Sequence, residues 1–335
     1  MKIKQIPFTL SCFLLLWGNH GLAQSCLGNV QDSFEDGVIS PLWLSTTSAC
    51  SSVAEVQGRL ELTKPTDCLE EAGVNLDAAR WVLCGDFDAQ VDFELLEFDI
   101  PNEDRWVAFR IREVATNAHW ATIERYNHSW QGACDPPPGE YYKAFEGGET
   151  NCQASFMATS DTNGRFRIRR TAQTLELSFW DSGIADWQLL RSSTVGGDDL
   201  FLVLNTRANA AGSHKVAFDN LEVLSSFGLD LQIENLVAGQ QASISIQGAL
   251  PDAEVGLAYS LSGFGPSNVS TLACGSISVD LSFPYFPLGL FQADSAGSLV
   301  ISQAVPAGSQ GISVWFQALD LSACRLSPPA HFQIQ

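Results

Sequence analysis

Apolar and polar positions alternate with a period of two along much of the chain. The clearest run is 87–95, and shorter runs follow at 165–169 and 174–179. Successive side chains of a strand point to opposite faces, so this alternation predicts strands with one buried and one solvated face. Turn-forming residues such as Asp161-Thr162-Asn163-Gly164 separate the runs, and no long amphipathic helix is evident. The pattern is typical of antiparallel β-sandwiches.

The first residues have the form of a secretory signal. Lys2 and Lys4 precede an apolar stretch at 8–17, and small residues stand at Gly21 and Ala23. Cleavage after Ala23 therefore defines a signal peptide at 1–23. A membrane span needs roughly 20 apolar residues, so this stretch is too short and we expect no membrane insertion. The mature protein is predicted to be exported and secreted.

Basic residues are distributed unevenly along the mature chain. The segment 227–335 contains a single basic residue, Arg325, whereas all other Lys and Arg residues precede it. This change in composition predicts two domains, at 24–226 and 227–335.

Removal of the signal leaves an even number of cysteines, which favours disulfides in an exported chain. They are Cys26, Cys50, Cys68, Cys84, Cys134, Cys152, Cys274 and Cys324. We expect the bridges Cys134–Cys152 and Cys274–Cys324, and the pairing of the first four cysteines stays open. Lipidation of Cys26 is an alternative that would leave an odd number.

The whole chain is strongly acidic, with 18 Lys and Arg residues against 38 Asp and Glu residues and a net charge of −20. Such a surface repels phosphate backbones, so nucleic acid is not an expected partner.

Several segments of the first domain resemble the concanavalin A-like jelly-roll superfamily, which includes laminin G-like modules. They are the opening 32–37, the strands 58–62 and 85–93, the hairpin 164–187 and the closing strand 217–223. The resemblance covers about residues 30–225 and implies a jelly-roll sandwich. Its members include lectins, glycosidases and adhesion modules, so the fold alone implies no single function.

The second domain is similar to an immunoglobulin-like module of exported bacterial proteins. The similarity rests on 231–240, 256–263, 305–308 and 314–320. The predicted fold class is therefore all-β: a concanavalin-like jelly-roll β-sandwich followed by a smaller immunoglobulin-like β-sandwich.

Aromatic residues are concentrated between 106 and 145. Aromatic rings stack on the apolar faces of sugars, and nearby polar side chains bind hydroxyl groups. We therefore predict a carbohydrate site formed by Trp106, Arg110, Trp120, Glu124, Tyr126, Trp130 and Tyr142. The alternative is that Trp106 and Trp120 belong to the core or simply cover the sheet.

Catalytic and metal sites are less well defined. Glucanases of the superfamily place carboxylates on one strand as Glu-x-Asp-x-x-Glu, and Glu97 and Asp99 match only its first half, with Pro101 interrupting the strand. No Gly-x-Ser-x-Gly motif or phosphate-binding loop is present. Carboxylates of the opening and closing segments (Glu35, Asp36 and Asp219) predict a structural calcium site.

The basic run Arg165, Arg167, Arg169 and Arg170 is interpreted as ion-paired rather than as a polyanion site, because the chain is so acidic.

The favoured function is a secreted, non-catalytic carbohydrate-binding or adhesion protein whose partner is a polysaccharide or cell-surface glycan. Two alternatives stay open. One is a divergent glycoside hydrolase using carboxylates among Glu94, Glu97, Asp99 and Glu124. The other is a structural cell-surface protein without a small ligand.

Overall fold

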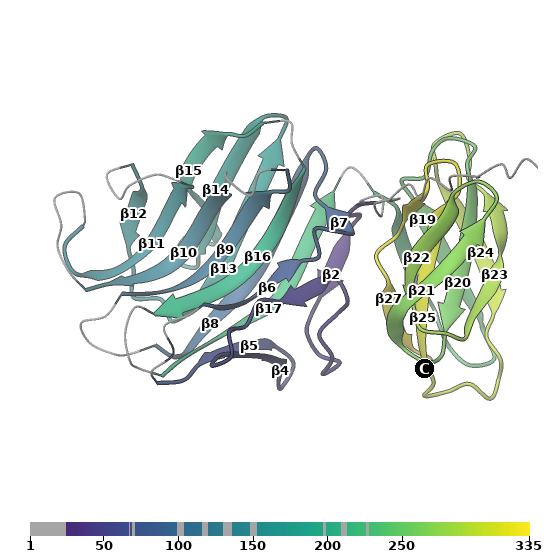
Figure 1. Cartoon of the computed structure of the whole chain (residues 1–335), viewed down its shortest axis with the longest axis horizontal. Helices are drawn as coiled ribbons and strands as arrows, with labels where there is room; N and C mark the ends of the chain where they lie inside the picture. Colours follow the sequence, from purple (N-terminus) through teal and green to yellow (C-terminus); the bar gives the residue numbers. More distant parts are fainter. Residues whose placement is uncertain are drawn as a thin grey trace, which may run out of the picture.

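The computed structural model describes residues 25–66, 68, 71–98, 104–115, 120–129, 136–147, 153–196, 199–208, 213–225 and 228–335. Every regular element in these residues is a strand, and the strands form a larger unit (β1–β17) and a smaller unit (β18–β27), as Figure 1 shows. Among the described residues, no helix is long and apolar enough to cross a membrane.

The larger unit contains a seven-stranded sheet in the order β12-β11-β10-β9-β16-β6-β3. Its strands are β3 (Trp43–Ser45), β6 (Ala72–Leu76), β9 (Arg105–Glu113), β10 (Trp120–His128), β11 (Gly139–Glu146), β12 (Ser155–Ala158) and β16 (Leu200–Ala208). All of these neighbours pair antiparallel.

The second sheet of the larger unit has eight strands in the order β15-β14-β13-β8-β17-β5-β4, with β2 beside β17. Its strands are β2 (Val30–Asp32), β4 (Ser52–Glu55), β5 (Leu60–Lys64), β8 (Phe87–Glu97), β13 (Asn163–Thr171), β14 (Thr174–Asp181), β15 (Asp186–Thr194) and β17 (His214–Ser225). Two short strands, β1 (Ser25–Cys26) and β7 (Trp81–Val82), pair in parallel outside both sheets.

One apolar core joins the two large sheets. Residues Phe87 to Phe93 of β8 alternate between buried and half-buried positions, as the period of two predicts. Phe109 and Ile123 from the seven-stranded sheet belong to the same core cluster as Phe93 and Phe166 from the eight-stranded sheet. The larger unit is therefore an antiparallel sandwich.

The smaller unit has a core of its own, built from two sheets. The first sheet contains β18 (Asp230–Glu234), β19 (Gln241–Gln247) and β24 (Leu299–Ala304). The second contains β20 (Glu254–Ser260), β23 (Tyr285–Gln292), β25 (Ser313–Asp320), β26 (Arg325–Leu326) and β27 (Ala330–Gln333). A separate hairpin is formed by β21 (Phe264–Thr271) and β22 (Gly275–Leu281).

The structure thus confirms the predicted all-β class, with one sandwich followed by a smaller one. The immunoglobulin-like relationship of the smaller unit stays a prediction. The change from one unit to the other falls between Ser225 at the end of β17 and Asp230 at the start of β18.

Three disulfides lie in the described residues. Cys26 bonds to Cys84 and Cys50 to Cys68, which settles the pairing that the sequence left open. The bond of Cys26 also argues against lipidation at that residue. The structure forms the expected Cys274–Cys324 bridge, whereas Cys134 and Cys152 lie outside the described residues. Disulfides of this number are typical of a protein in an oxidising compartment.

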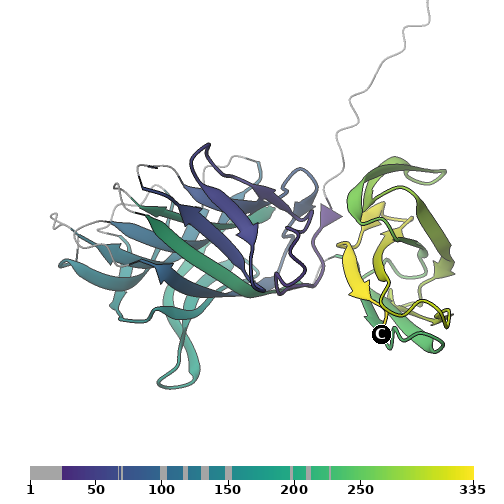
Figure 2. The same cartoon turned by 90° about the horizontal axis from the view of Figure 1, so that it is seen from below.

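The two units contact each other through apolar residues and a buried ion pair. Figure 2 shows the backbone of the two units from below. Val279 of β22 belongs to the same apolar cluster as Trp81 of the larger unit. The guanidinium of Arg80 binds the carboxylate of Asp280, which is 1% exposed. Burial raises the pKa of Asp280, and the charge of Arg80 opposes this shift. Gln317 adds a hydrogen bond to the same carboxylate at 3.2 Å.

The position of Asp280 predicts that the two units depend on Arg80 for stability. In an Arg80→Met variant the buried carboxylate loses its cation, so the free energy of unfolding in urea should fall by about 3 kcal/mol. Adding Asp280→Leu should recover most of that loss. Arg169→Met removes an exposed guanidinium and is the control, with an expected change under about 1 kcal/mol. Equal losses of unfolding free energy in Arg80→Met and Arg169→Met would contradict the prediction.

A buried histidine begins the last strand of the larger unit. His214 is 0% exposed, and its Nε2 atom forms a hydrogen bond with the Thr206 hydroxyl. Burial lowers the pKa of His214 to about 3, and the positive charges of Arg105 and Lys64 act in the same direction. The native protein therefore keeps this imidazole neutral at pH values where an unfolded chain binds a proton.

This pKa difference predicts an acid-sensitive stability. Above pH about 6.5 the residue is neutral in both states and contributes no pH dependence. Below that pH only the unfolded chain takes up the proton, so stability falls as the pH drops towards 3, by at most about 1.4 kcal/mol per pH unit. His214→Gln should flatten this slope in urea unfolding measured from pH 8 to pH 4. Parallel slopes for the two proteins would exclude the mechanism.

Candidate ligand-binding face

A cavity of about 480 Å³ lies on the face of the seven-stranded sheet that points away from the core. We call it the outer-face cavity. It is lined by Glu71, Trp106, Arg110, Arg112, Glu124, Tyr126, Lys143, Phe145 and Arg207. On β9 these residues alternate with the core residues Val107, Phe109 and Ile111.

Strand register brings the lining residues together from four strands. Trp106 of β9 lies opposite both Tyr126 of β10 and Arg207 of β16. Glu124 of β10 lies opposite Lys143 of β11. Directly opposed residues have neighbouring side chains, so the sheet brings together residues as far apart in the chain as Trp106 and Arg207.

The aromatic side chains of the cavity are in contact with cations. The rings of Trp106 and Tyr126 have centroids 6.3 Å apart and planes inclined by 55°. The Arg207 guanidinium lies 5.7 Å from the Trp106 ring centroid, and the Lys143 ammonium lies 4.6 Å from that of Tyr126. Lys143 is also 4.5 Å from the ring of Phe145. These distances are within the range of cation–π attraction.

Two carboxylates, Glu71 and Glu124, form ion pairs with the basic groups of the cavity. Arg110, only 5% exposed, has one terminal nitrogen 3.9 Å from Glu124 and the other 3.7 Å from Glu71. Glu124 is 2% exposed and also lies 3.4 Å from the Lys143 ammonium. Arg207 is 3.8 Å from Glu71. Burial lowers the pKa of Arg110, while the two carboxylates oppose that shift.

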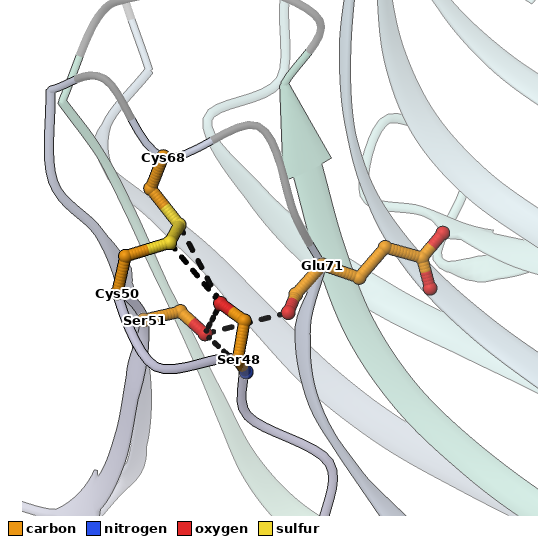
Figure 3. Close-up of a disulfide and its surroundings, with 5 residues drawn as sticks. All are labelled: Ser48, Cys50, Ser51, Cys68 and Glu71. Carbon is orange, nitrogen blue, oxygen red and sulfur yellow. Dashed lines mark hydrogen bonds between the residues drawn. A yellow bond between two sulfur atoms is a disulfide. The ribbon is translucent and has the colours of Figure 1, made fainter.

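The Cys50–Cys68 disulfide lies beside the segment that carries Glu71, as Figure 3 shows. The Ser51 hydroxyl donates to the Glu71 backbone oxygen at 3.4 Å and is 3.0 Å from the Ser48 hydroxyl. The Glu71 side chain points away from the disulfide in this view. Its Oε2 atom accepts a hydrogen bond from the Asn205 amide at 2.9 Å. The Cys50–Cys68 disulfide, through Ser51, positions the Glu71 backbone, and the hydrogen bond from Asn205 positions its carboxylate beside the cavity.

Four of the residues predicted for a carbohydrate site meet in this cavity: Trp106, Arg110, Glu124 and Tyr126. The side chain of Trp120 and the whole of Trp130 lie outside what the structure describes.

The carbohydrate site predicted from the sequence did not include the other cavity residues. Some of them could have been predicted and others could not. Arg112 and Phe145 follow from the period of two, because each lies on the cavity-facing side of its strand. Glu71 and Arg207 come from chain segments far from 106–145, and only the sheet order brings them to the cavity.

The prediction for Tyr142 is wrong. This side chain is 0% exposed and points into the core, where its ring stacks on Phe179 at 4.0 Å. Its hydroxyl donates to Asp161 at 2.9 Å. The neighbouring residue Lys143 faces the cavity, and successive strand residues point to opposite faces, so Tyr142 must point inward.

The described carboxylates considered for glycoside hydrolysis, Glu94, Glu97 and Glu124, do not meet at the cavity. Glu94 and Glu97 are exposed on β8, which belongs to the eight-stranded sheet. Glu94 forms an ion pair with Arg59 at 2.6 Å. Asp99 lies outside the described residues. Of the three described carboxylates in that prediction, only Glu124 lines the cavity.

Two of the carboxylates predicted to bind calcium, Glu35 and Asp36, line a pocket that is shared by the two units. Burial raises the pKa of Asp219, and the charges of Asp92 and Glu35 act in the same direction. Asp36 lies 3.6 Å from the His331 imidazole of the smaller unit. In the described part of the chain, no three His, Cys, Asp or Glu side chains are arranged to hold a metal ion. The calcium site stays a prediction.

The basic run of β13 is ion-paired, as expected from the acidity of the chain. The pairs are Arg165 with Asp92, Arg167 with Asp88, and Arg169 with Glu176. Arg170 donates instead to the backbone oxygens of Ala172 and Gly196.

The core position of Tyr142 leads to a test that separates it from Tyr126. Tyr142→Phe removes only the hydrogen bond to Asp161, so the free energy of unfolding should fall by about 1 kcal/mol. Tyr126→Leu opens the cavity wall, and any ligand affinity should fall in this variant and not in Tyr142→Phe. Chemical denaturation and ligand titration of both variants provide the comparison. Loss of affinity in Tyr142→Phe would contradict the assignment.

No family model and no curated protein matches the chain. Similar solved structures include a Bacillus licheniformis β-glucanase, with 10% identity and a TM-score of 0.40, covering 59% of this chain and 98% of that one. Another is the Emp47p carbohydrate recognition domain, with 12% identity and a TM-score of 0.43, covering 59% and 94%. A third comes from work on endo-acting O-glycanases of the human gut microbiota, with 12% identity and a TM-score of 0.44, covering 58% and 98%. At these values the similarities assign neither a family nor an activity to the chain.

Proposed function

We propose that the chain is a secreted, non-catalytic glycan-binding protein whose ligand occupies the outer-face cavity. The observation that carries this proposal is the juxtaposition of Trp106 and Tyr126, on adjacent strands, with charged side chains in one open cavity. Aromatic rings provide an apolar surface for the C–H face of a sugar ring, and the surrounding polar groups bind its hydroxyls. The secretory signal at 1–23 and the disulfides support export of the protein.

The polar atoms of the cavity support a hydrogen-bonding ligand. Trp106 Nε1, Arg112 Nε and Arg207 Nε are buried and have no hydrogen-bond partner among the described residues. A buried donor without a partner is destabilising by about 1–3 kcal/mol, so such donors favour a site that is completed by a bound molecule or water. The cavity volume of about 480 Å³ is that of a small-molecule site.

The ion pairs of the cavity favour binding over hydrolysis. Glycoside hydrolysis uses two carboxyl groups, one of which must donate a proton. Here Glu71 and Glu124 both lie within 4 Å of the Arg110 guanidinium, and Glu124 is also 3.4 Å from the Lys143 ammonium, so both carboxylates are held in ion pairs within the protein. A hydrolase acting through Glu124 is the alternative that the assay below distinguishes.

Substitution of the stacking surface tests the proposal. After a glycan array has identified a ligand, Trp106→Ala should lower its affinity about tenfold, because the sugar loses its stacking partner. Calorimetric titration measures the change. Trp187→Ala is the control, because Trp187 is a half-buried tryptophan of the eight-stranded sheet that contacts Trp180.

Release of reducing sugar is assayed on the same ligand. Turnover that disappears in Glu124→Gln would replace binding with hydrolysis as the function. An unchanged affinity in Trp106→Ala would exclude the cavity as the site. If no glycan on the array binds, a structural surface protein without a small ligand becomes the favoured function.

A further inference from the structure

The outer-face cavity has the opposite charge to the rest of the molecule. The described residues of its lining include four basic side chains and two acidic ones, for a local charge of +2. The whole chain has 18 basic and 38 acidic residues and a net charge of −20. The basic residues of β13, by contrast, are each held by a carboxylate or by backbone oxygens.

The surplus positive charge is concentrated at Arg112 and Arg207. Glu124 lies closest to Arg110 and Lys143, and Glu71 is shared by Arg110 and Arg207 at 3.7 and 3.8 Å. No carboxylate of the described residues lies within 4 Å of the Arg112 guanidinium. Glu71 and Glu124 therefore do not neutralise the combined charge of Arg112 and Arg207, and an anionic ligand can bind these two guanidinium groups.

We propose that the ligand of this cavity is an acidic glycan, whose carboxylate or sulfate groups bind Arg112 and Arg207. The inference rests on the proposed glycan-binding function and assigns the class of glycan. A guanidinium presents a planar set of donors that matches the two oxygens of a carboxylate or sulfate. Arg207 lies against the Trp106 ring, so one sugar unit can stack on the ring while its acidic group reaches the guanidinium.

The charge of the remaining surface restricts where an acidic glycan can bind. An acidic polymer is repelled by a chain of net charge −20, and the outer-face cavity is the place where attraction replaces that repulsion. A neutral glycan can accept hydrogen bonds from the four basic groups, but it gains no charge–charge attraction from them. The acidic surroundings thus direct an acidic chain to the cavity.

The test compares polymers that differ mainly in charge. Mature protein is titrated with polygalacturonate, with the same polymer after full methyl esterification, with a sulfated galactan and with a neutral β-glucan. Affinity for polygalacturonate or for the sulfated galactan should exceed that for the esterified and neutral polymers about tenfold or more, and should decrease as NaCl is raised. Preference between the two acidic polymers identifies carboxylate or sulfate as the recognised group.

Single substitutions test whether the acidic polymer binds at Arg112 and Arg207. Arg112→Gln and Arg207→Gln should each weaken binding of the acidic polymer about tenfold. Arg169→Gln, an equal change of charge on the eight-stranded sheet, should leave the affinity unchanged. Equal affinity for the esterified and acidic polymers, or for the variants and the native protein, overturns the inference. If Trp106→Ala still weakens binding in that case, the proposed function survives; if no glycan binds at all, both fail.

Discussion

The seven-stranded sheet has one face committed to the core, and this constraint organises the rest of the larger unit. Val107, Phe109 and Ile111 of β9 are fully or almost fully buried against the eight-stranded sheet. Because side chains alternate along a strand, Trp106, Arg110 and Arg112 must then face the other way. A shift of register by one residue would place guanidinium groups in the apolar core and is excluded by their desolvation. The core therefore determines where the cavity side chains point.

A second constraint acts within the cavity. Arg110 is almost fully buried, and an isolated buried cation is strongly unfavourable. Glu71 and Glu124, one on either side of its guanidinium, provide the compensating charge. The Glu71 backbone is held beside the Cys50–Cys68 disulfide through Ser51, so a covalent constraint supports an electrostatic one. Among the described residues, Arg112 has no carboxylate within 4 Å, and this difference is the basis for proposing Arg112 and not Arg110 as a ligand contact.

Sequence patterns predicted the elements well and the site in part. Alternation in 87–95 identified a strand and its buried face, because the pattern is local and has a period of two. Tyr142 was misplaced because aromatic character alone was used, without the parity that puts Lys143 on the cavity side. Glu71 and Arg207 could not have been found in this way. They reach the cavity only because β16 lies between β9 and β6, and no local pattern encodes that order.

The net charge of the chain describes the protein surface as a whole, but it does not describe the charge of the outer-face cavity. A net charge of −20 excludes a general affinity for polyanions, and the pairing of the β13 arginines agrees with that interpretation. Electrostatic attraction at a site, however, depends on the charges within about 10 Å, because salt screens those farther away. Arg110 and Arg112 of β9 and Arg207 of β16 lie together on one face of one sheet, and among the described residues the acidic ones that line the cavity with them are Glu71 and Glu124. An acidic protein can therefore contain a local anion site, and its overall charge then discourages acidic chains from binding elsewhere.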